Sequence, residues 1–436
     1  MRNEIFRQFC SVICFSILCF NLGCKDAVKN LSVGGSIRAD VVTFDPASVQ
    51  SPGDPPKFFY GPQSFNQIED INTLSGPRLS LLQGGDIEIQ EVLGSVIISN
   101  QFGGFTTPNL EYRIVDDVVK PLNTKALNML SAIFHFDMLI GKVEALTGLS
   151  EDEFFNEFSA LKVIYHPAVK VSSSGEVLKK YETSNAAYLA GSRQFALFSP
   201  GKNEQLPLAY NPQIVAHEFG HAIFERTFYN NRFERCERGT YVDQKLFPGR
   251  LEQEFVIRGV NEGFADLVSF VWTGSSNILQ SSFGETAVSR ERNFSKIDFD
   301  YDNYSFNLSD VCGGGFYCIG TLWAKTLFEV YLSRGLDPKN SDARKEFLRE
   351  VVQLMADVGK SMREFDGDRL PTPDEDSSEC LTRDSLSPSY DEDVMSVFFE
   401  AVIENAAAGK RKGYCDAIAK YFGPTAFPST VRGGCK

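Results

Sequence analysis

Histidine is scarce in this sequence, and its few positions limit where histidine-based chemistry can occur. The 436 residues contain four histidines, and none follows His221. Two of the four, His217 and His221, lie in one short stretch. A site that needs a histidine in the second half of the chain must therefore use another residue type there.

The sequence also lacks the motifs and the charge of nucleotide-binding and nucleic-acid-binding proteins. It has no G-x-x-x-x-G-K-[ST] phosphate-binding loop, and residues 313–315, three glycines, lack the strand-to-helix context of a dinucleotide-binding turn. The formal net charge of −14 disfavours contact with nucleic acids or anionic membranes. No internal repeat is present. These absences fit a soluble exported domain.

The one extended apolar run at the N-terminus predicts export. Residues 9–20 follow Arg2 and Arg7 and form a run too short to be a membrane-spanning helix, so residues 1–23 are expected to be a signal peptide. Gly23-Cys24 resembles a bacterial lipobox, which predicts cleavage before Cys24 and lipid attachment to its thiol, although Asn21 stands where an aliphatic residue is usual. Simple secretion and a retained anchor are the alternatives. Membrane contact is expected only through this lipid.

Export makes the remaining cysteines candidates for disulfides. The six beyond Cys24 are Cys236, Cys312, Cys318, Cys380, Cys415 and Cys435. An even number in an oxidising compartment predicts structural disulfides, and six cysteines allow fifteen pairings. A bridge between Cys312 and Cys318 would fix the loop that presents Tyr317.

The stretch around which the chain is organised is residues 214–224, IVAHEFGHAIF. His217, Glu218 and His221 form an H-E-x-x-H motif, and positions i and i+4 share one face of a helix. Two imidazoles at this spacing can hold one metal ion, with the glutamate directed to the same side. The alternative is a buried helix with two incidental histidines.

A catalytic zinc needs a third protein ligand and an open position. Glu262, in the run GVNEGFADLVS of residues 259–269, is the candidate. Asp266 follows one helical turn later and is placed to hold a ligand imidazole, most plausibly His217. The alternative is an ordinary acidic first turn of a helix, which the helix dipole favours.

These residues resemble the gluzincin metallopeptidases, and more closely their thermolysin-like and fungalysin-like families. HEFGH followed by NEGFAD implies one zinc ion on His217, His221 and Glu262, with Glu218 as general base and Asp266 behind the ligands. SNAAY, residues 184–188, resembles the family's edge strand that binds the substrate backbone, which implies roles for Asn185 and Ala186. The run GGFYCIGTLWAKTLFEV, residues 314–330, is similar to the helix that carries a second catalytic histidine.

Two features depart from that family pattern. The 41 positions from His221 to Glu262 require an insertion between the two zinc helices. Tyr317 stands where the resemblance implies a histidine. A tyrosine hydroxyl stays protonated at neutral pH and can donate the same hydrogen bond to an oxyanion. Within the insertion, Tyr229 and Tyr241 are further candidate donors, and a solvated loop is the favoured interpretation of the segment itself.

We expect an α+β fold with two lobes like thermolysin. Residues 1–23 are assigned to the signal, 24–76 to an extended Ser-, Gly- and Pro-rich tether in which some strands can form, 77–225 to a mixed N-terminal lobe with the zinc helix, and 226–436 to a mainly helical C-terminal lobe. Short runs near residues 87–89, 96–98 and 112–115 predict strands, and residues 127–146 predict a helix. Helices are also expected at 322–332, 343–356, 393–407 and 414–422, with a loop at 370–390.

The remaining titratable residues are not expected to bind metal. His135 and His166 have no partner spacing and are interpreted as structural. Asp298, Asp300 and Asp302 alternate as calcium ligands can, but the glycine and the terminal glutamate of an EF-hand are missing, so a Ca²⁺ site is possible but unsupported.

The sequence therefore predicts a monomeric zinc-dependent peptidase of the bacterial cell envelope, periplasmic or surface-exposed and lipid-anchored, or else secreted. It would act on extracellular or envelope proteins or peptides. A zinc-binding but catalytically weak surface lipoprotein that binds a protein partner is the second hypothesis, because of Tyr317. An aminopeptidase-type gluzincin is the third, although no acidic motif for a free amine precedes the zinc helix.

Overall fold

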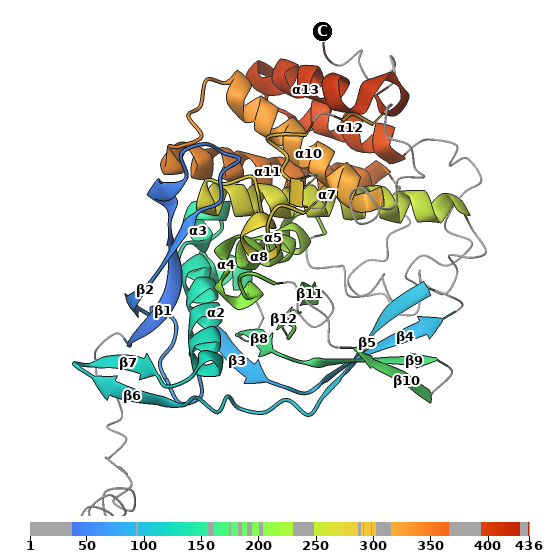
Figure 1. The fold of residues 1–436 in the computed structure, drawn as a ribbon. Coiled ribbons are helices and arrows are strands. Elements are labelled where there is room, and N and C mark those ends of the chain that lie inside the picture. The colour runs from blue at the N-terminus through green and yellow to red at the C-terminus, as the bar shows by residue number, and fades with distance from the viewer. Residues whose placement is uncertain are drawn as a thin grey trace, which may run out of the picture. The chain divides into compact units, whose positions relative to one another are not determined.

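The computed structural model describes residues 37–92, 95–155, 160–173, 176–181, 185–189, 194–199, 204–229, 248–286, 289–290, 292–297, 299–301, 315–365, 394–427 and 435. The chain separates into residues 1–35, which are outside these ranges, and a compact unit of residues 36–436. The described residues all belong to the compact unit, which is shown in Figure 1.

The first sheet contains a segment that the sequence analysis assigned to a tether. Its strand order is β2-β1-β7-β6, with bounds β1 (Arg38–Asp45), β2 (Lys57–Ser64), β6 (Tyr112–Val115) and β7 (Val118–Pro121). Ala39 and Val41 of β1 are fully buried, and Val42 N donates to Ser131 Oγ across 2.9 Å. The assignment of residues 24–76 to a tether is thus wrong from residue 37 onward. The apolar residues of β1 are drawn into the core, and the Pro- and Gly-rich run only connects β1 to β2.

Two further sheets follow, with strand orders β10-β9-β4-β5 and β11-β12-β8-β3. Their bounds are β3 (Leu79–Gln83), β4 (Asp86–Val92), β5 (Ser95–Gly103), β8 (Leu161–Tyr165), β9 (Ala168–Ser173), β10 (Glu176–Tyr181), β11 (Ala186–Leu189) and β12 (Gln194–Leu197). The strands expected at residues 87–89, 96–98 and 112–115 are confirmed as parts of β4, β5 and β6. β11 lies at the edge of its sheet, paired antiparallel with β12.

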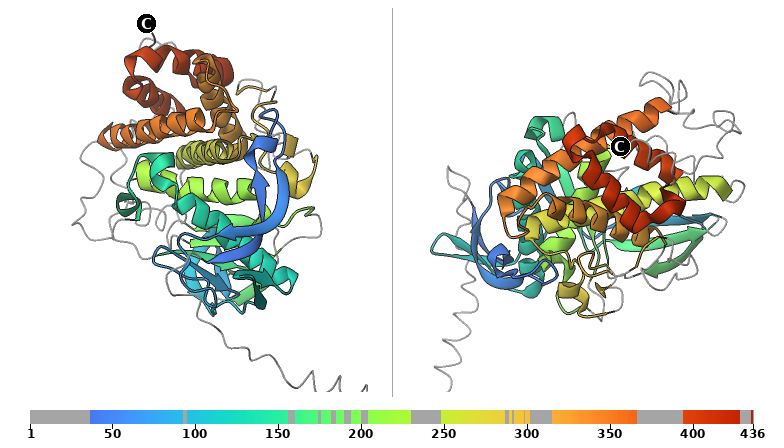
Figure 2. Two further views of the ribbon diagram at one scale, coloured as in Figure 1. Left: turned by 90° about the vertical axis from the view of Figure 1, so that its left-hand side faces the viewer. Right: turned by 90° about the horizontal axis from the view of Figure 1, so that it is seen from above.

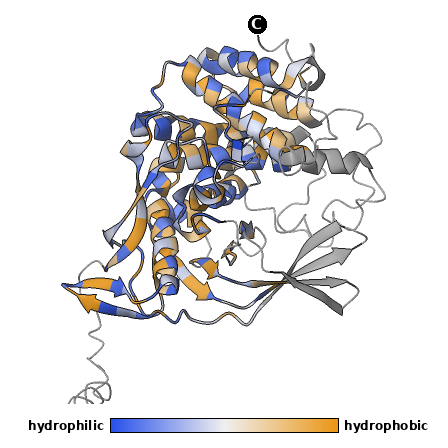
Figure 3. Ribbon diagram, in the orientation of Figure 1, coloured by the Kyte–Doolittle hydropathy of each residue, from blue (hydrophilic) through white to orange (hydrophobic). Residues whose placement is uncertain are grey.

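An apolar helix, α2 (Thr124–Ile140), packs against β1 and β3 (Figure 1). The helix expected at residues 127–146 is divided into α2 and α3 (Val143–Thr147), and α4 (Glu151–Phe155) follows. The interruption falls at Gly141, since glycine is a poor helix former. Apolar residues predominate in α2, α10 and α12 (Figure 3), but α2 also buries His135 and Asp137.

Beyond the strands, the described residues are mainly helical. The helices are α5 (Pro212–Thr227), α7 (Pro248–Thr273), α8 (Gln280–Phe283), α10 (Gly315–Ser333), α11 (Ser341–Phe365), α12 (Val394–Asn405) and α13 (Ala408–Ala426). The four helices expected after residue 320 are confirmed. The chain is therefore a mixed α/β protein, with a strand-rich N-terminal part and a helical C-terminal part. Its likeness to the thermolysin fold and its division into two lobes stay predictions.

Glycines allow the central helices to approach closely. At Gly220 of α5, an added Cβ would lie 2.7 Å from Ala265 Cα of α7. At Gly320 of α10, an added Cβ would lie 2.7 Å from Glu262 Cβ of α7. Both distances are too short for a real side chain, so α7 is held against α5 on one side and α10 on the other. This arrangement joins the two halves of the candidate site.

A disulfide closes the C-terminal region, where Cys415 of α13 is bonded to Cys435. Cys318 is also disulfide-bonded. None of the helices in the described ranges is long and apolar enough to cross a membrane.

Candidate metal centre

The two histidines of the H-E-x-x-H motif lie on one face of α5. The helix is capped at its N-terminus by Asn211, whose side chain accepts from Gln213 N, and Pro212 occupies the first turn. His217 and His221 are one helical turn apart, and their Nε2 atoms are 3.2 Å from each other. The helix expected from the apolar pattern is thus present and directs both imidazoles to one point.

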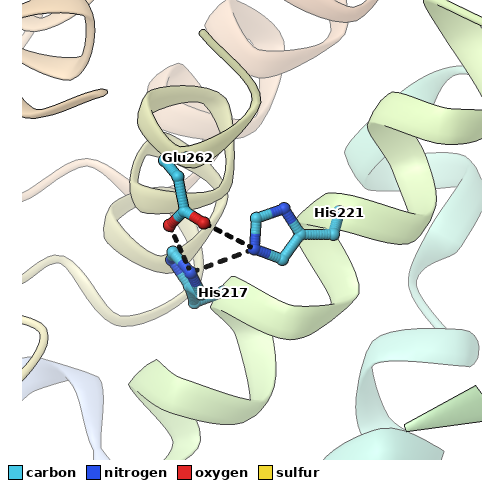
Figure 4. Close-up of side chains that lie close together, drawn as sticks. All are labelled: His217, His221 and Glu262. Atoms are coloured by element: carbon cyan, nitrogen blue, oxygen red, sulfur yellow. Dashed lines mark hydrogen bonds and ion pairs between the residues drawn. The ribbon is translucent and has the colours of Figure 1, made fainter. Parts of the chain in front are cut away.

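Glu262 of α7 completes the cluster, as Figure 4 shows. Its Oε2 lies 3.3 Å from His217 Nε2, and its Oε1 lies 3.8 Å from His221 Nε2. The three side chains each offer one ligand atom, and these atoms lie within 4.8 Å of one another. Because α7 begins at Pro248, Glu262 is in the interior of a helix. The alternative of an acidic first turn is therefore wrong.

The spacing of the three ligand atoms suits a small cation. Bonds of about 2.0–2.1 Å in a tetrahedral zinc site separate the ligand atoms by about 3.3–3.4 Å. The two Nε2 atoms are 3.2 Å apart, and the Glu262 carboxylate lies 3.3 Å from one of them through Oε2 and 3.8 Å from the other through Oε1, so the three groups are spaced close to that value. Two nitrogens and one oxygen also match the donor set that zinc prefers over calcium or magnesium. The residues therefore fit a metal ion.

Each imidazole is held from behind by a second residue of α7. His217 Nδ1 lies 2.8 Å from Asp266 Oδ1, and His221 Nδ1 lies 2.9 Å from Asn261 Oδ1. When the imidazoles are neutral, such contacts favour the tautomer with the proton on Nδ1, which leaves the Nε2 lone pairs directed at the cluster. Asp266 is where the sequence analysis placed it. The role of Asn261 was not foreseen, although it precedes Glu262 directly.

Arg292 was missed by the sequence analysis. Its Nη2 donates to Asp266 Oδ1 across 2.7 Å and lies 3.6 Å from Glu262 Oε2. The guanidinium carbon is 4.8 Å from the centre of the Tyr317 ring. Arg292 comes from an irregular segment far from the motifs, and no spacing rule relates it to them.

The net charge of the cluster is negative when both imidazoles are neutral, so a divalent cation can be accommodated. Glu218, Glu262 and Asp266 are three carboxylates, and the cation in contact with two of them is Arg292 when both imidazoles are neutral. Burial alone would raise the pKa of Glu262, but His221, His217 and Arg292 outweigh it and lower the pKa to about 2. Burial alone would lower the pKa of His217, but Asp266 and Glu262 raise it to about 10. Without another cation, a proton on His217 balances this negative charge.

Glu218 lies between the cluster and the sheet edge. Its Oε2 accepts a hydrogen bond of 2.7 Å from Tyr188 N of β11. Burial raises the pKa of Glu218, while the neighbouring imidazoles and the Tyr188 N–H oppose the rise. A carboxyl group with a raised pKa can accept and return a proton near neutral pH.

Tyr317 belongs to the same neighbourhood. It is half-buried in the first turn of α10, with its ring over Arg292. The negative charge of Glu262, together with burial, raises the pKa of Tyr317. The phenol therefore stays protonated and can donate a hydrogen bond.

The two residues expected to bind substrate lie at the start of β11. Ala186 is buried in β11, and Asn185 is exposed one residue before it. The Asn185 side chain accepts from Ala186 N across 2.9 Å, and its backbone oxygen accepts from Phe198 N. β11 is brought to the cluster through the Tyr188–Glu218 hydrogen bond.

Other candidates lie away from the cluster or outside the described residues. His135 is buried between Phe44 and Phe134, and His166 stacks on Tyr165. Tyr229 packs on Phe224 and Phe228. Several features predicted from the sequence lie outside the described residues. They are the signal, Cys24, the first part of the tether, Cys236, Tyr241, Asp298, Asp302, Cys312, Cys380 and the loop at 370–390.

Comparison with protein families and curated proteins does not assign a function to this site. No protein-family model matches the chain, and no curated protein matches it.

Proposed function

We propose that this chain is a zinc-dependent peptidase of the gluzincin type. One observation carries the proposal. The Nε2 atoms of His217 and His221 face each other at 3.2 Å, while both Nδ1 atoms are engaged by α7. Two lone pairs held this close need a cation or a proton between them, and a metal ion can take the place of the proton that His217 otherwise carries. Glu262 adds a carboxylate to the same point.

Zinc is favoured by the ligand set. Two imidazoles and one carboxylate are the protein ligands of catalytic zinc in several metallopeptidases, which keep one position open. Calcium and magnesium prefer oxygen ligands in larger number. Zinc bound here would supply a Lewis acid and would lower the pKa of a water molecule to about 7.

Glu218 has the position and the environment of a general base. Its carboxylate follows the first ligand in α5 and is held at Oε2 by the Tyr188 N–H. The second oxygen can take a proton from the attacking water and later pass it to the leaving amine. Burial favours the protonated form of Glu218, which assists the second of these steps.

Tyr317 and Arg292 supply positive potential beside the cluster. The phenol stays protonated because of Glu262 and can donate to an oxyanion that develops at the carbonyl carbon. The guanidinium is kept charged by Asp266 and Glu262 and stacks under the phenol ring.

A peptide is the substrate class that the sheet edge favours. An extended peptide can add to an edge strand through main-chain hydrogen bonds. β11 is such a strand, and its Tyr188 N–H already reaches the proposed base. Asn185 and Ala186 would hold the peptide along this edge. We further propose that the protein is exported and lipid-anchored, on the grounds of residues 1–24, and that it is a monomer.

A second function rests on Tyr317. If the phenol does not support turnover, the site is a zinc-stabilised surface that binds a protein partner. Both functions need the metal ion, but only the peptidase function needs the Glu218 carboxylate.

The test uses protein without residues 1–23 and measures bound zinc and cleavage of casein or a quenched peptide. Wild type should hold about one zinc per chain and cleave. Glu218→Gln keeps the metal ligands and should abolish cleavage while retaining zinc. Zinc without cleavage in wild type would favour the second function, and no bound metal would refute both.

A further inference from the structure

The segment that carries Arg292 is irregular, yet it places a buried guanidinium among three polar groups of the site. Residues 292–297 form turns without a helix or strand of their own. Such a segment can hold a side chain within a fraction of an ångström only if its backbone and neighbours are fixed by other parts of the chain.

Helices α7 and α10 fix one side of this segment. Phe294 is fully buried and packs edge-on against Phe270 of α7, with Phe328 of α10 on another side. Lys325 of α10, which is buried, donates from Nζ to Ser295 O across 3.2 Å. These contacts hold the residues that follow Arg292.

The other side of the segment is held by the connection between β1 and β2. Pro52 O accepts from Ser276 N across 2.6 Å and lies 2.9 Å from Ser276 Oγ. The same hydroxyl is 2.8 Å from Asn293 Oδ1 and 2.7 Å from Ser295 Oγ. Asn293 Nδ2 reaches back to Gly53 O at 3.5 Å. Figure 2 shows the β1–β2 hairpin (blue) beside this segment (yellow).

This contact is largely buried as well as polar. Ser276, Asn293 and Arg292 are all buried, so a polar group that loses its partner here is not satisfied by bulk water. Asn293 is the residue directly after Arg292. A shift of its backbone therefore changes the position from which the guanidinium reaches Asp266.

We propose that the β1–β2 connection, residues 51–54, positions Arg292 for the metal centre through Ser276 and Asn293. In this role the connection fixes the position of Arg292. Arg292 donates a hydrogen bond to Asp266, and Asp266 contacts the imidazole of His217. Residues 38–64 are then a support of the site and not a removable extension. This inference rests on the proposed metal site for its consequence, but the positioning itself does not require metal.

The central variant is Ser276→Ala/Asn293→Ala. It removes the side-chain contacts to residues 52, 53 and 295 but retains the Ser276 N–H and every group that touches the cluster. Metal affinity, measured by competition with a chelator, should fall about tenfold, since loss of outer supports typically weakens metal sites by ~10–100-fold. In metal-free protein, deuterium uptake should rise both at residues 51–54 and at 289–297.

A matched control is Ser289→Ala. Ser289 is a buried serine of the same region whose hydroxyl contacts Gly284 O and Thr286. These contacts of the Ser289 hydroxyl do not involve residues 52–53, so Ser289→Ala should retain wild-type metal affinity. A merely structural role would make both variants lose affinity in proportion to their loss of unfolding free energy.

A double-variant cycle separates positioning through Arg292 from a direct effect. In an Arg292→Gln background, adding Ser276→Ala/Asn293→Ala should change metal affinity by less than about twofold. Additive losses, or unchanged uptake at residues 289–297 in the metal-free protein, would overturn the inference. If wild type binds no metal but uptake rises at both segments, the positioning stands and the proposed function fails. If metal affinity is unchanged in the variant, the proposed function stands and the positioning fails.

Discussion

Gly320 of α10 rests directly against Glu262 of α7, so that a Cβ at position 320 would lie 2.7 Å from Glu262 Cβ and 2.9 Å from Gly259 O. The helix that carries Tyr317 can approach the third proposed ligand only because residue 320 has no side chain. The metal centre and the helix crossing are therefore parts of one packing arrangement.

Gly320→Ala should damage the site and the fold together. The new methyl group overpacks the α7–α10 contact, which costs about 1–3 kcal/mol of unfolding free energy, and it displaces Glu262. We expect metal affinity to fall at least about tenfold. Gly409→Ala is the control, because position 409 in α13 has nothing within 4 Å. Wild-type affinity in Gly320→Ala would show that α10 can move away without disturbing Glu262.

Tyr317→Phe isolates the contribution of the phenol hydroxyl. The phenyl ring still covers Arg292, so zinc content should not change, while kcat should fall about 100-fold if the hydroxyl stabilises the oxyanion. KM should change little. The companion variant Tyr317→His restores the residue type that the family resemblance implies. Equal activity of wild type and Tyr317→Phe, with a gain in Tyr317→His, would favour the catalytically weak binding protein.

Asp266→Asn and Asn261→Asp should move metal affinity in opposite directions. Asp266→Asn removes the charge behind His217 and the partner of Arg292, so affinity should fall about 10–100-fold. Asn261→Asp places a carboxylate behind His221 and should raise affinity, because it makes the imidazole more basic. Chelator competition at one pH measures both. Equal losses in the two variants would mean that shape, and not charge, matters behind the imidazoles.

Acid should destabilise the fold through His135. Burial lowers the pKa of His135 to about 4, against about 6.5 in the unfolded chain. The unfolded state therefore binds more protons between pH 6.5 and 4, and stability is fully present above this window and lost as the pH falls through it. The loss from this one group should reach about 2 kcal/mol by pH 5.

The check is the slope of unfolding free energy between pH 7.5 and pH 5, from urea titrations of metal-free protein. His135→Leu should reduce the slope without removing it. His166 is expected to contribute in the same direction, because burial lowers its pKa to about 4 as well. His217 opposes this loss between pH 7.5 and 6.5, because Asp266 and Glu262 raise its pKa to about 10. An unchanged slope in His135→Leu would mean that His135 stays protonated in the folded protein.

Local chemistry made part of the site predictable. The spacing of His217 and His221, and that of Glu262 and Asp266, follows from the 3.6-residue period of a helix, which depends only on nearby residues. The strands near residues 87, 97 and 113 and the late helices were predictable for the same reason. Composition led to a wrong prediction at residues 37–64, where the Pro- and Gly-rich connection between two strands was assigned to a tether.

The sequence by itself determined which residues can ligate a metal and that they lie on helices. Tertiary structure decided the rest: that α5 and α7 cross at Gly220, that β11 reaches Glu218, and that Arg292 lies behind Asp266 and under Tyr317. Contacts of this kind join residues tens or hundreds of positions apart. They depend on how whole elements pack, and no local period or motif in the chain encodes them.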